Sequence, residues 1–225
     1  IQTANSFFME TLNFSECTLG LLENKFGIIS IFTSEALTNW IRSTWQLQTE
    51  DLSVVSRLSA LLTRNAEHWN EYDLGLHFIG PMFSLVDFTQ PYRFNLFGQS
   101  TLTSVVDGIQ LTGRVDEMIA TGFRIPKAPF FAFSEYKRQT DPNGDPAGQA
   151  LAAMLAGQSL NEDGKPIYGC FVIGKIWNFM VLEGRHYALS HAFDGTQTED
   201  AFQILRILFQ LKQYCMERTE PPPAN

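Results

Sequence analysis

Residues 113–137 read GRVDEMIATGFRIPKAPFFAFSEYK, and this stretch sets the expectations for the fold. Two apolar runs rich in β-forming residues flank a turn region, 121–126, which contains glycine and proline. Such a pattern is typical of two antiparallel strands joined as a hairpin. The stretch therefore predicts the central hairpin of a sheet.

Side chains alternate between the two faces of a strand, so the second strand of this hairpin has two predictable faces. One face is expected to carry Phe131, Phe133, Glu135 and Lys137, and the other Ser134 and Tyr136. If the first strand pairs beside it, Asp116 and Glu135 meet at one edge of the sheet, next to Lys137. Two carboxylates and an ammonium at one point predict a site for a hard divalent cation and a phosphate.

Composition limits the class of protein. The chain has 225 residues, of which 44% are hydrophobic and 18% charged, as in a globular protein with a sizeable core. Its net charge of −8 argues against a protein that coats nucleic acid through its overall field. Three separated cysteines without a CxxC pair predict neither a disulfide framework nor a zinc site, and favour a cytoplasmic location. No apolar run reaches the length of a bilayer span, so no membrane partner is expected.

Turn signals, capping residues and hydrophobic periodicity predict the remaining elements. Helices are expected at 19–26, at 34–41, from about residue 49, and from Asn70 to Pro81, where proline bends or ends the helix. Strands are expected at 92–97, 102–106, 109–119, 130–137, 167–173, 177–182 and 186–191. Asp145 and Pro146 open a helix at 147–158, and a last helix covers 199–216.

This order predicts an α/β sandwich in which helices flank a mixed central sheet. Residues 1–66 are expected to form a helical N-terminal extension, residues 67–218 the core, and residues 219–225 a disordered tail.

A helix with an acidic residue, then Gly-Arg-Val-Asp116, then Glu135-Tyr-Lys137, then a small-residue helix that opens with Gln149, resembles the PD-(D/E)xK nuclease superfamily. The branch most similar includes the N-terminal nuclease domain of type I restriction motor subunits and stand-alone bacterial relatives. The resemblance covers residues 68–216 and implies a restriction endonuclease-like fold.

The resemblance also implies roles for individual residues. Asp116 and Glu135 are expected to hold Mg²⁺, for which Mn²⁺ can substitute, and Lys137 to orient or activate water or to stabilise developing charge. Gln149 is expected beside this site. Glu71 corresponds to an optional acidic residue on the first core helix, and Glu67 is a rival for that place.

The function expected on this basis is Mg²⁺-dependent hydrolysis of DNA phosphodiester bonds. DNA is then the partner, and the chain acts as a homodimer or within a larger restriction or repair assembly. Two alternatives stay open: a catalytically silent binding module on the same fold, and a hydrolase of small phosphate substrates.

Two further groups of charged residues bear on these alternatives. Glu117 lies on the opposite strand face from Asp116 and is expected to be a surface charge. Seven basic residues form either one basic rim around the site or an ordinary mixed surface: Arg93, Arg114, Lys127, Arg138, Lys165, Lys175 and Arg185.

Overall fold

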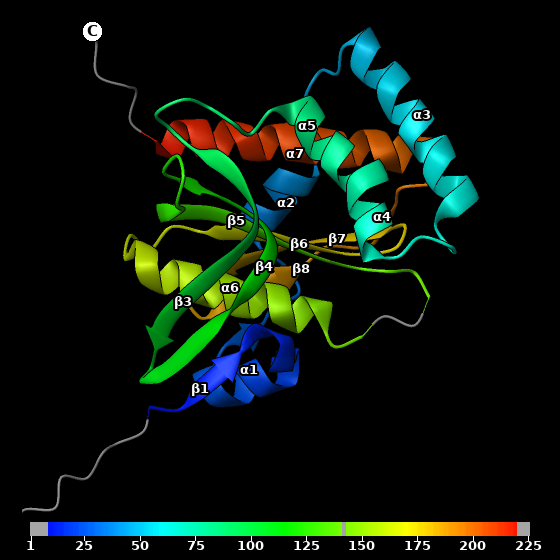
Figure 1. Cartoon of the computed structure of the whole chain (residues 1–225). Coiled ribbons are helices and arrows are strands. Elements are labelled where there is room, and N and C mark those ends of the chain that lie inside the picture. The colour runs from blue at the N-terminus through cyan, green and yellow to red at the C-terminus, as the bar shows by residue number, and fades with distance from the viewer. Residues whose placement is uncertain (1–8, 141–142, 220–225) are drawn as a thin grey trace, which may run out of the picture.

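The computed structural model describes residues 9–140 and 143–219, and it shows an α/β architecture with a mixed sheet between two layers of helices (Figure 1). The expected α/β sandwich is confirmed at this level. Most of the tail expected at 219–225 lies outside the described residues.

Nine strands make up the described sheet. Its main path runs in the order β1, β4, β5, β6, β7, β8, β2, with β3 paired to β4 and β9 paired to β7. The central strands are β3 (Asn95–Val106), β4 (Ile109–Thr121), β5 (Lys127–Lys137), β6 (Ile167–Ile173), β7 (Ile176–Glu183) and β8 (His186–Leu189). The short strands are β1 (Thr11–Asn13), β2 (Ile29–Ser30) and β9 (Phe193–Asp194). The predicted hairpin is present, since β4 and β5 are antiparallel, while β5 and β6 are parallel across the intervening helix α6 (Pro146–Asn161).

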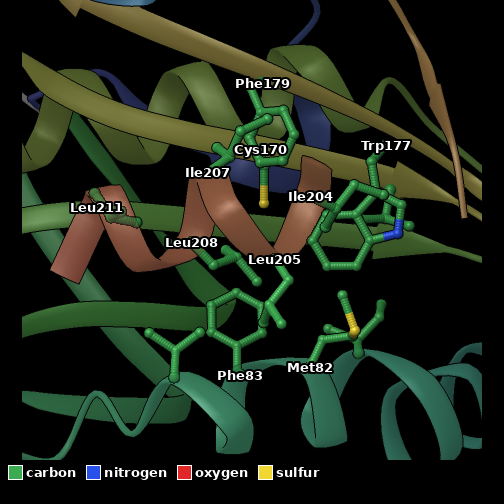
Figure 2. Packing of buried hydrophobic residues seen from close by; sticks show 14 of the residues in the cluster. Met82, Phe83, Cys170, Trp177, Phe179, Ile204, Leu205, Ile207, Leu208 and Leu211 are labelled. Atoms are coloured by element: carbon green, nitrogen blue, oxygen red, sulfur yellow. The ribbon is translucent and has the colours of Figure 1, made fainter. Parts of the chain in front are cut away.

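Helices cover the two faces of the sheet unequally (Figure 1). One face carries α6 and α1 (Leu19–Phe26); the short 3-10 turn η1 (Phe14–Glu16) packs on the same side. The other carries α7 (Thr198–Arg218), α2 (Glu35–Ile41), α3 (Thr49–Asn65), α4 (Glu71–Leu74) and α5 (Gly80–Val86). Figure 2 shows the core on the α7 face, where Ile204, Leu208 and Leu211 pack against Phe83, Trp177 and Phe179.

Residues 9–66, the described part of the segment expected as a helical extension at 1–66, contain two short strands besides helices. β1 joins the sheet parallel to β4, and β2 joins it parallel to β8. Trp40 on α2 is buried in the main core, where its indole N–H donates to the Ile207 carbonyl oxygen at 2.9 Å. The segment is thus packed into the same sheet and core as the residues that follow.

The helix that begins after Asn70 does not end at Pro81. Asn70 caps it by accepting a hydrogen bond from the Asp73 N–H at 2.9 Å, as its position predicts. The chain then passes through a π-helical turn, η2 (Gly75–Ile79), directly into α5, which runs on to Val86. Proline has no backbone N–H to donate. Because Pro81 lies in the first turn after the wider π turn, the helix can continue past it.

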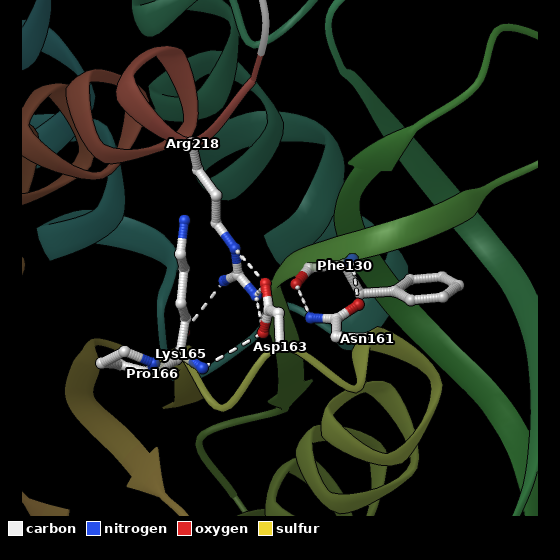
Figure 3. A network of polar contacts seen from close by, with 6 residues as sticks. All are labelled: Phe130, Asn161, Asp163, Lys165, Pro166 and Arg218. Atoms are coloured by element: carbon white, nitrogen blue, oxygen red, sulfur yellow. Dashed lines mark hydrogen bonds and ion pairs between the residues drawn. The ribbon is translucent and has the colours of Figure 1, made fainter.

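The start of β5 is fixed by a polar network at the far end of the strand from Lys137 (Figure 3). The Asn161 carboxamide pairs with both the N–H and the carbonyl oxygen of Phe130, at 2.7 Å each. Nearby, Arg218 donates to the Asp163 carboxylate and to the Pro166 carbonyl oxygen. These contacts tie the beginning of β5 to the ends of α6 and α7.

The expected alternation along β5 is wrong at Phe131. The register with β4 shifts between Ile119, which faces Ala132, and Ala120, which faces Phe130, so that Phe131 is the extra residue of a β-bulge. Phe131 packs with Phe94 on the α7 face, whereas Phe133 lies in the core on the α6 face. Beyond the bulge the pairing is regular up to Ser134.

Candidate active site

The candidate site lies where β4 parts from β5. One edge of β4 pairs with β3 along nearly its whole length. The other edge pairs with β5 at 117–121 and with β1 at 110–112, and residues 113–116 between them pair with neither. Among the described strands, β6 alone pairs with the last residues of β5, from Glu135 to Lys137. Asp116 therefore stands at a fork in the sheet.

The Asp116 carboxylate fills this fork. Its Oδ2 accepts a hydrogen bond from the Tyr136 backbone N–H at 2.9 Å. In a regular antiparallel ladder this N–H would donate to a backbone carbonyl oxygen of β4, and here the Asp116 side chain replaces that acceptor. Its Oδ1 accepts a hydrogen bond from Gln99 Nε2 at 2.8 Å. Each carboxylate oxygen can accept two hydrogen bonds, which leaves accepting capacity on both oxygens.

Glu135 and Lys137 face one another beside the fork, as predicted from the strand period. Lys137 Nζ lies 2.5 Å from Glu135 Oε1, and both side chains are largely covered, with exposed fractions of 13% and 9%. Lys137 Nζ also lies 4.0 Å from Oε1 of Glu71, the first residue of α4. The structure thus brings Asp116, Glu135, Lys137 and Glu71 together from three elements.

Burial and like charge set the protonation of this group. Desolvation, and then the charge of Asp116, raise the pKa of Glu135 to about 7, although Lys137 acts in the opposite direction. Burial alone would lower the pKa of Lys137, but the hydrogen bond and charge of Glu135, with Glu71 and Asp116, outweigh it and raise that pKa. Lys137 therefore keeps its proton at neutral pH.

The two rivals for the helix acid, and the glutamine expected beside them, take distinct places. Glu71 faces Lys137, whereas Glu67 lies at 3.5 Å from the Thr140 hydroxyl. Gln149 is buried in the first part of α6, with its carboxamide against Gly144, where an added Cβ would come within 2.5 Å of Nε2. Within the described ranges no hydrogen bond joins the Gln149 side chain to Asp116, Glu135 or Lys137.

Glu117 is not the surface charge that its strand face suggested. Its Oε2 is buried and has no hydrogen-bond partner in the described part of the chain. Desolvation, and then the charge of Asp116, raise its pKa to about 8, and its own charge in turn raises the pKa values of Tyr136 and Cys170. Glu117 is therefore half-buried, with one carboxylate oxygen covered on the face of the sheet that carries Cys170.

The basic residues do not form one rim. Because β5 and β6 run parallel, both strands begin at one end of the sheet and finish at the other, where the site lies. Lys127, Lys165 and Arg185 lie at the end where β5 and β6 begin, and Arg93 donates to the carbonyl oxygens of Met216 and Thr219 at the end of α7. Lys175 lies in the turn after β6, at the site end. Arg138 follows β5 at that same end, and Arg114 donates to the Gln99 carbonyl oxygen next to Asp116.

The oxygen donors at the fork suit a hard divalent cation. Asp116 and Glu135 offer carboxylate oxygens, the ligand type that Mg²⁺ prefers, and Mg²⁺ needs only one or two protein carboxylates when waters and substrate phosphate complete its shell. No group of three or more His, Cys, Asp or Glu side chains within residues 9–140 and 143–219 is arranged to hold a metal ion. The donors present fit a sparsely ligated, water-rich cation and not an all-protein cage.

Comparison with known proteins adds no assignment: no protein-family model matches the chain, and no curated protein matches it. No helix in the part of the chain that the structure describes is long and apolar enough to cross a membrane.

Proposed function

We propose that this protein is a Mg²⁺-dependent nuclease that hydrolyses DNA phosphodiester bonds. The proposal is supported by the convergence of Asp116 on β4 with Glu135 and Lys137 on β5. Glu71 on α4 adds a further carboxylate, whose Oε1 lies 4.0 Å from Lys137 Nζ. Phosphodiester hydrolysis requires charge neutralisation at the phosphate and a placed water, and these side chains supply both signs of charge at one point.

In this proposal Asp116 and Glu135 hold the cation, which would supply Lewis-acid polarisation of the phosphate and a more acidic bound water. Lys137 keeps its proton, because its pKa is raised, and donates a hydrogen bond to a nonbridging phosphate oxygen. That role differs from a base that takes a proton from water. Glu71, nearly half exposed, holds the ammonium group from the solvent side.

The test is cleavage of single-stranded, duplex and nicked DNA in Mg²⁺ or Mn²⁺. Lys137→Ala is expected to lose at least a hundredfold in rate, in the range found when one electrostatic donor is removed from a site. Lys165→Ala, at the opposite end of the sheet, is the matched control and should keep the wild-type rate. Thermal melts of both variants establish that the fold is intact. Equal rates for wild type and Lys137→Ala on all three substrates would refute the proposal.

A second candidate function, a silent binding module, is favoured by one observation. Lys137 Nζ already lies 2.5 Å from Glu135 Oε1, so the ammonium neutralises the carboxylate that the nuclease proposal gives to the cation. Calorimetry with Mn²⁺ separates the two functions. Binding that Asp116→Asn weakens supports the nuclease, whereas the absence of binding, or binding that Asp116→Asn leaves unchanged, supports the module.

A further inference from the structure

The backbone of Gln99 adopts a conformation that its position in a strand does not explain. Five non-glycine residues in the described chain have positive φ: Asp87, Tyr92, Gln99, Asp107 and Glu162. Four of them lie at helix ends or in turns, and Gln99, with φ of 50°, lies inside β3. A left-handed conformation costs a residue with a Cβ on the order of 1–2 kcal/mol, and glutamine lacks the short side chain that lets Asn and Asp tolerate it.

Packing does not account for this strain. Gln99 is exposed, as is the neighbouring Gly98, so no burial of its side chain holds the backbone in place. Strain that persists on an exposed strand residue is typical of positions where side-chain direction serves a site.

At the strained residue Gln99, the regular alternation of side chains between the two sheet faces is interrupted in both β3 and β4. Gly98 pairs with Glu117 and Ser100 with Val115, so the register between β3 and β4 is unbroken on either side of Gln99 and Asp116. Yet Val115 and Met118, three residues apart, both lie in the core on the α6 face, which strict alternation forbids. The break in alternation therefore falls at Asp116 and Glu117, directly across from Gln99.

The side chain of Gln99 then acts on Asp116. Its Nε2 donates to Asp116 Oδ1 at 2.8 Å, while the Tyr136 N–H holds Oδ2. Arg114 holds Gln99 in turn, since its Nε donates to the Gln99 carbonyl oxygen at 2.8 Å. Two donors on two different oxygens fix the carboxylate in one rotamer and leave accepting capacity on each oxygen.

We propose that Gln99 is a positioning residue, whose left-handed backbone aims its carboxamide at Asp116 and holds that carboxylate in the fork between β4 and β5. The positioning of Asp116 follows from geometry alone. Its consequence for cation binding rests on the proposed nuclease function.

Gln99→Gly is the informative variant, because glycine adopts positive φ without strain and only the side chain is lost. The primary readout is hydrogen exchange of the Tyr136 backbone N–H in the metal-free protein, since that amide loses its acceptor when Asp116 is released. We expect exchange about tenfold faster in Gln99→Gly, with the amides of β7 unchanged as an internal reference. Glu162→Gly, which removes an exposed left-handed residue at the end of α6, is the matched control and should leave Tyr136 unchanged.

A double-mutant cycle tests whether Gln99 acts through Asp116. In the Asp116→Asn background, Gln99→Gly should accelerate Tyr136 exchange much less than it does in wild type. Unchanged Tyr136 exchange in Gln99→Gly overturns the proposal, and so does equal acceleration in both backgrounds.

The second readout is Mn²⁺ affinity, which Gln99→Gly should lower about 10- to 100-fold, as is usual for partners that orient a metal ligand. If wild type binds no Mn²⁺ while Tyr136 exchange still accelerates, the nuclease proposal fails and the positioning role stands. If wild type binds Mn²⁺, Asp116→Asn abolishes that binding, and Gln99→Gly changes neither readout, the positioning role fails alone.

Discussion

Replacing Glu117 by glutamine should stabilise the protein increasingly as pH rises from 5 to 7. The Glu117 carboxyl has one buried oxygen without a hydrogen-bond partner among the described residues, and desolvation together with the Asp116 charge raises its pKa to about 8. Tyr136 and Cys170 are the other titratable groups within its electrostatic reach, and both stay neutral over this pH range because their pKa values are raised further. The folded protein therefore keeps a proton on Glu117 at neutral pH, which the unfolded chain gives up.

The sign and size follow from this difference. Between the ordinary value of 4.5 and the folded value of about 8, folding takes up a proton, so the stability contributed by Glu117 falls as pH rises. The slope is at most about 1.4 kcal/mol per pH unit and is smaller at pH 5, where the unfolded carboxyl still binds part of its proton, so the interval from pH 5 to pH 7 gives about 2 kcal/mol. Glutamine does not titrate, and any cost of burying its amide is the same at each pH. The free energy of unfolding of Glu117→Gln minus that of wild type should thus grow by about 2 kcal/mol between pH 5 and pH 7.

The assay is urea unfolding of both proteins at pH 5, 6 and 7 in the presence of a chelator. Glu135, with a pKa of about 7, titrates in both proteins, and its contribution largely cancels in the difference. Glu162→Gln, on an exposed side chain, controls for the exchange of carboxylate for carboxamide. A difference between Glu117→Gln and wild type that stays constant from pH 5 to pH 7 would refute the reasoning, because it would mean that water reaches the carboxylate.

Three further predictions concern the site and its supports. Because the pKa of Glu135 is about 7, Mn²⁺ binding should displace a proton from Glu135 below that pH. Calorimetry should then show a Mn²⁺ affinity that rises several-fold from pH 6 to pH 7 and levels off above pH 7, and an affinity independent of pH would contradict this prediction. Gly113→Ala should lower the free energy of unfolding in urea by about 1–3 kcal/mol, because its Cβ would lie 2.5 Å from the Phe14 ring. Adding Phe14→Leu should recover part of this loss, and a full loss in the double variant would show that the clash lies elsewhere. Asn161→Ala should lower the free energy of unfolding by about 1–3 kcal/mol, because it removes both hydrogen bonds to the Phe130 backbone. Unchanged unfolding in urea would show that water replaces these hydrogen bonds.

Local signals predicted the elements that they encode directly. Ser34, Asn70 and Asp145 cap helices where their side chains can accept an N–H, and Gly27 ends α1 in the left-handed conformation. The Asp107-Gly108 turn joins β3 to β4, and both residues have positive φ, as a tight hairpin requires. These features depend on a few neighbouring residues, so the sequence alone suffices.

Features that depend on distant residues were missed. β1 and β2 have three and two residues, too few to show a period, and they are strands only because β4 and β8 offer free edges. Two strands were expected at 92–97 and 102–106, whereas one strand, β3, runs from Asn95 to Val106 and continues through the left-handed backbone at Gln99. Alternation predicted that Glu117 and Asp116 lie on opposite strand faces, but it cannot show that one oxygen of Glu117 is buried.

The candidate site was predictable in part for the same reason. Period two on one strand places Glu135 beside Lys137, and a hairpin brings Asp116 to them, so three residues follow from local pattern. Glu71 could not be separated from Glu67 without the helix position, which sets Glu71 against Lys137. Gln99 was missed entirely. Its only signal was a polar residue after a glycine within an otherwise β-prone stretch, which fits a loop equally well.

The locally unfavourable features of this sheet lie together around Asp116. Gln99 is strained opposite it, and Glu117 beside it has a buried oxygen that no described residue pairs. The largely covered Glu135 and Lys137 lie across the fork. A sheet shaped by stability alone would pair β4 with β5 through this point and place apolar residues there. Proteins that violate several local rules at one place usually do so where a site needs the geometry. If that holds here, Gln99→Gly and Glu117→Gln should both leave the protein at least as stable as wild type, while Gln99→Gly releases the Asp116 carboxylate.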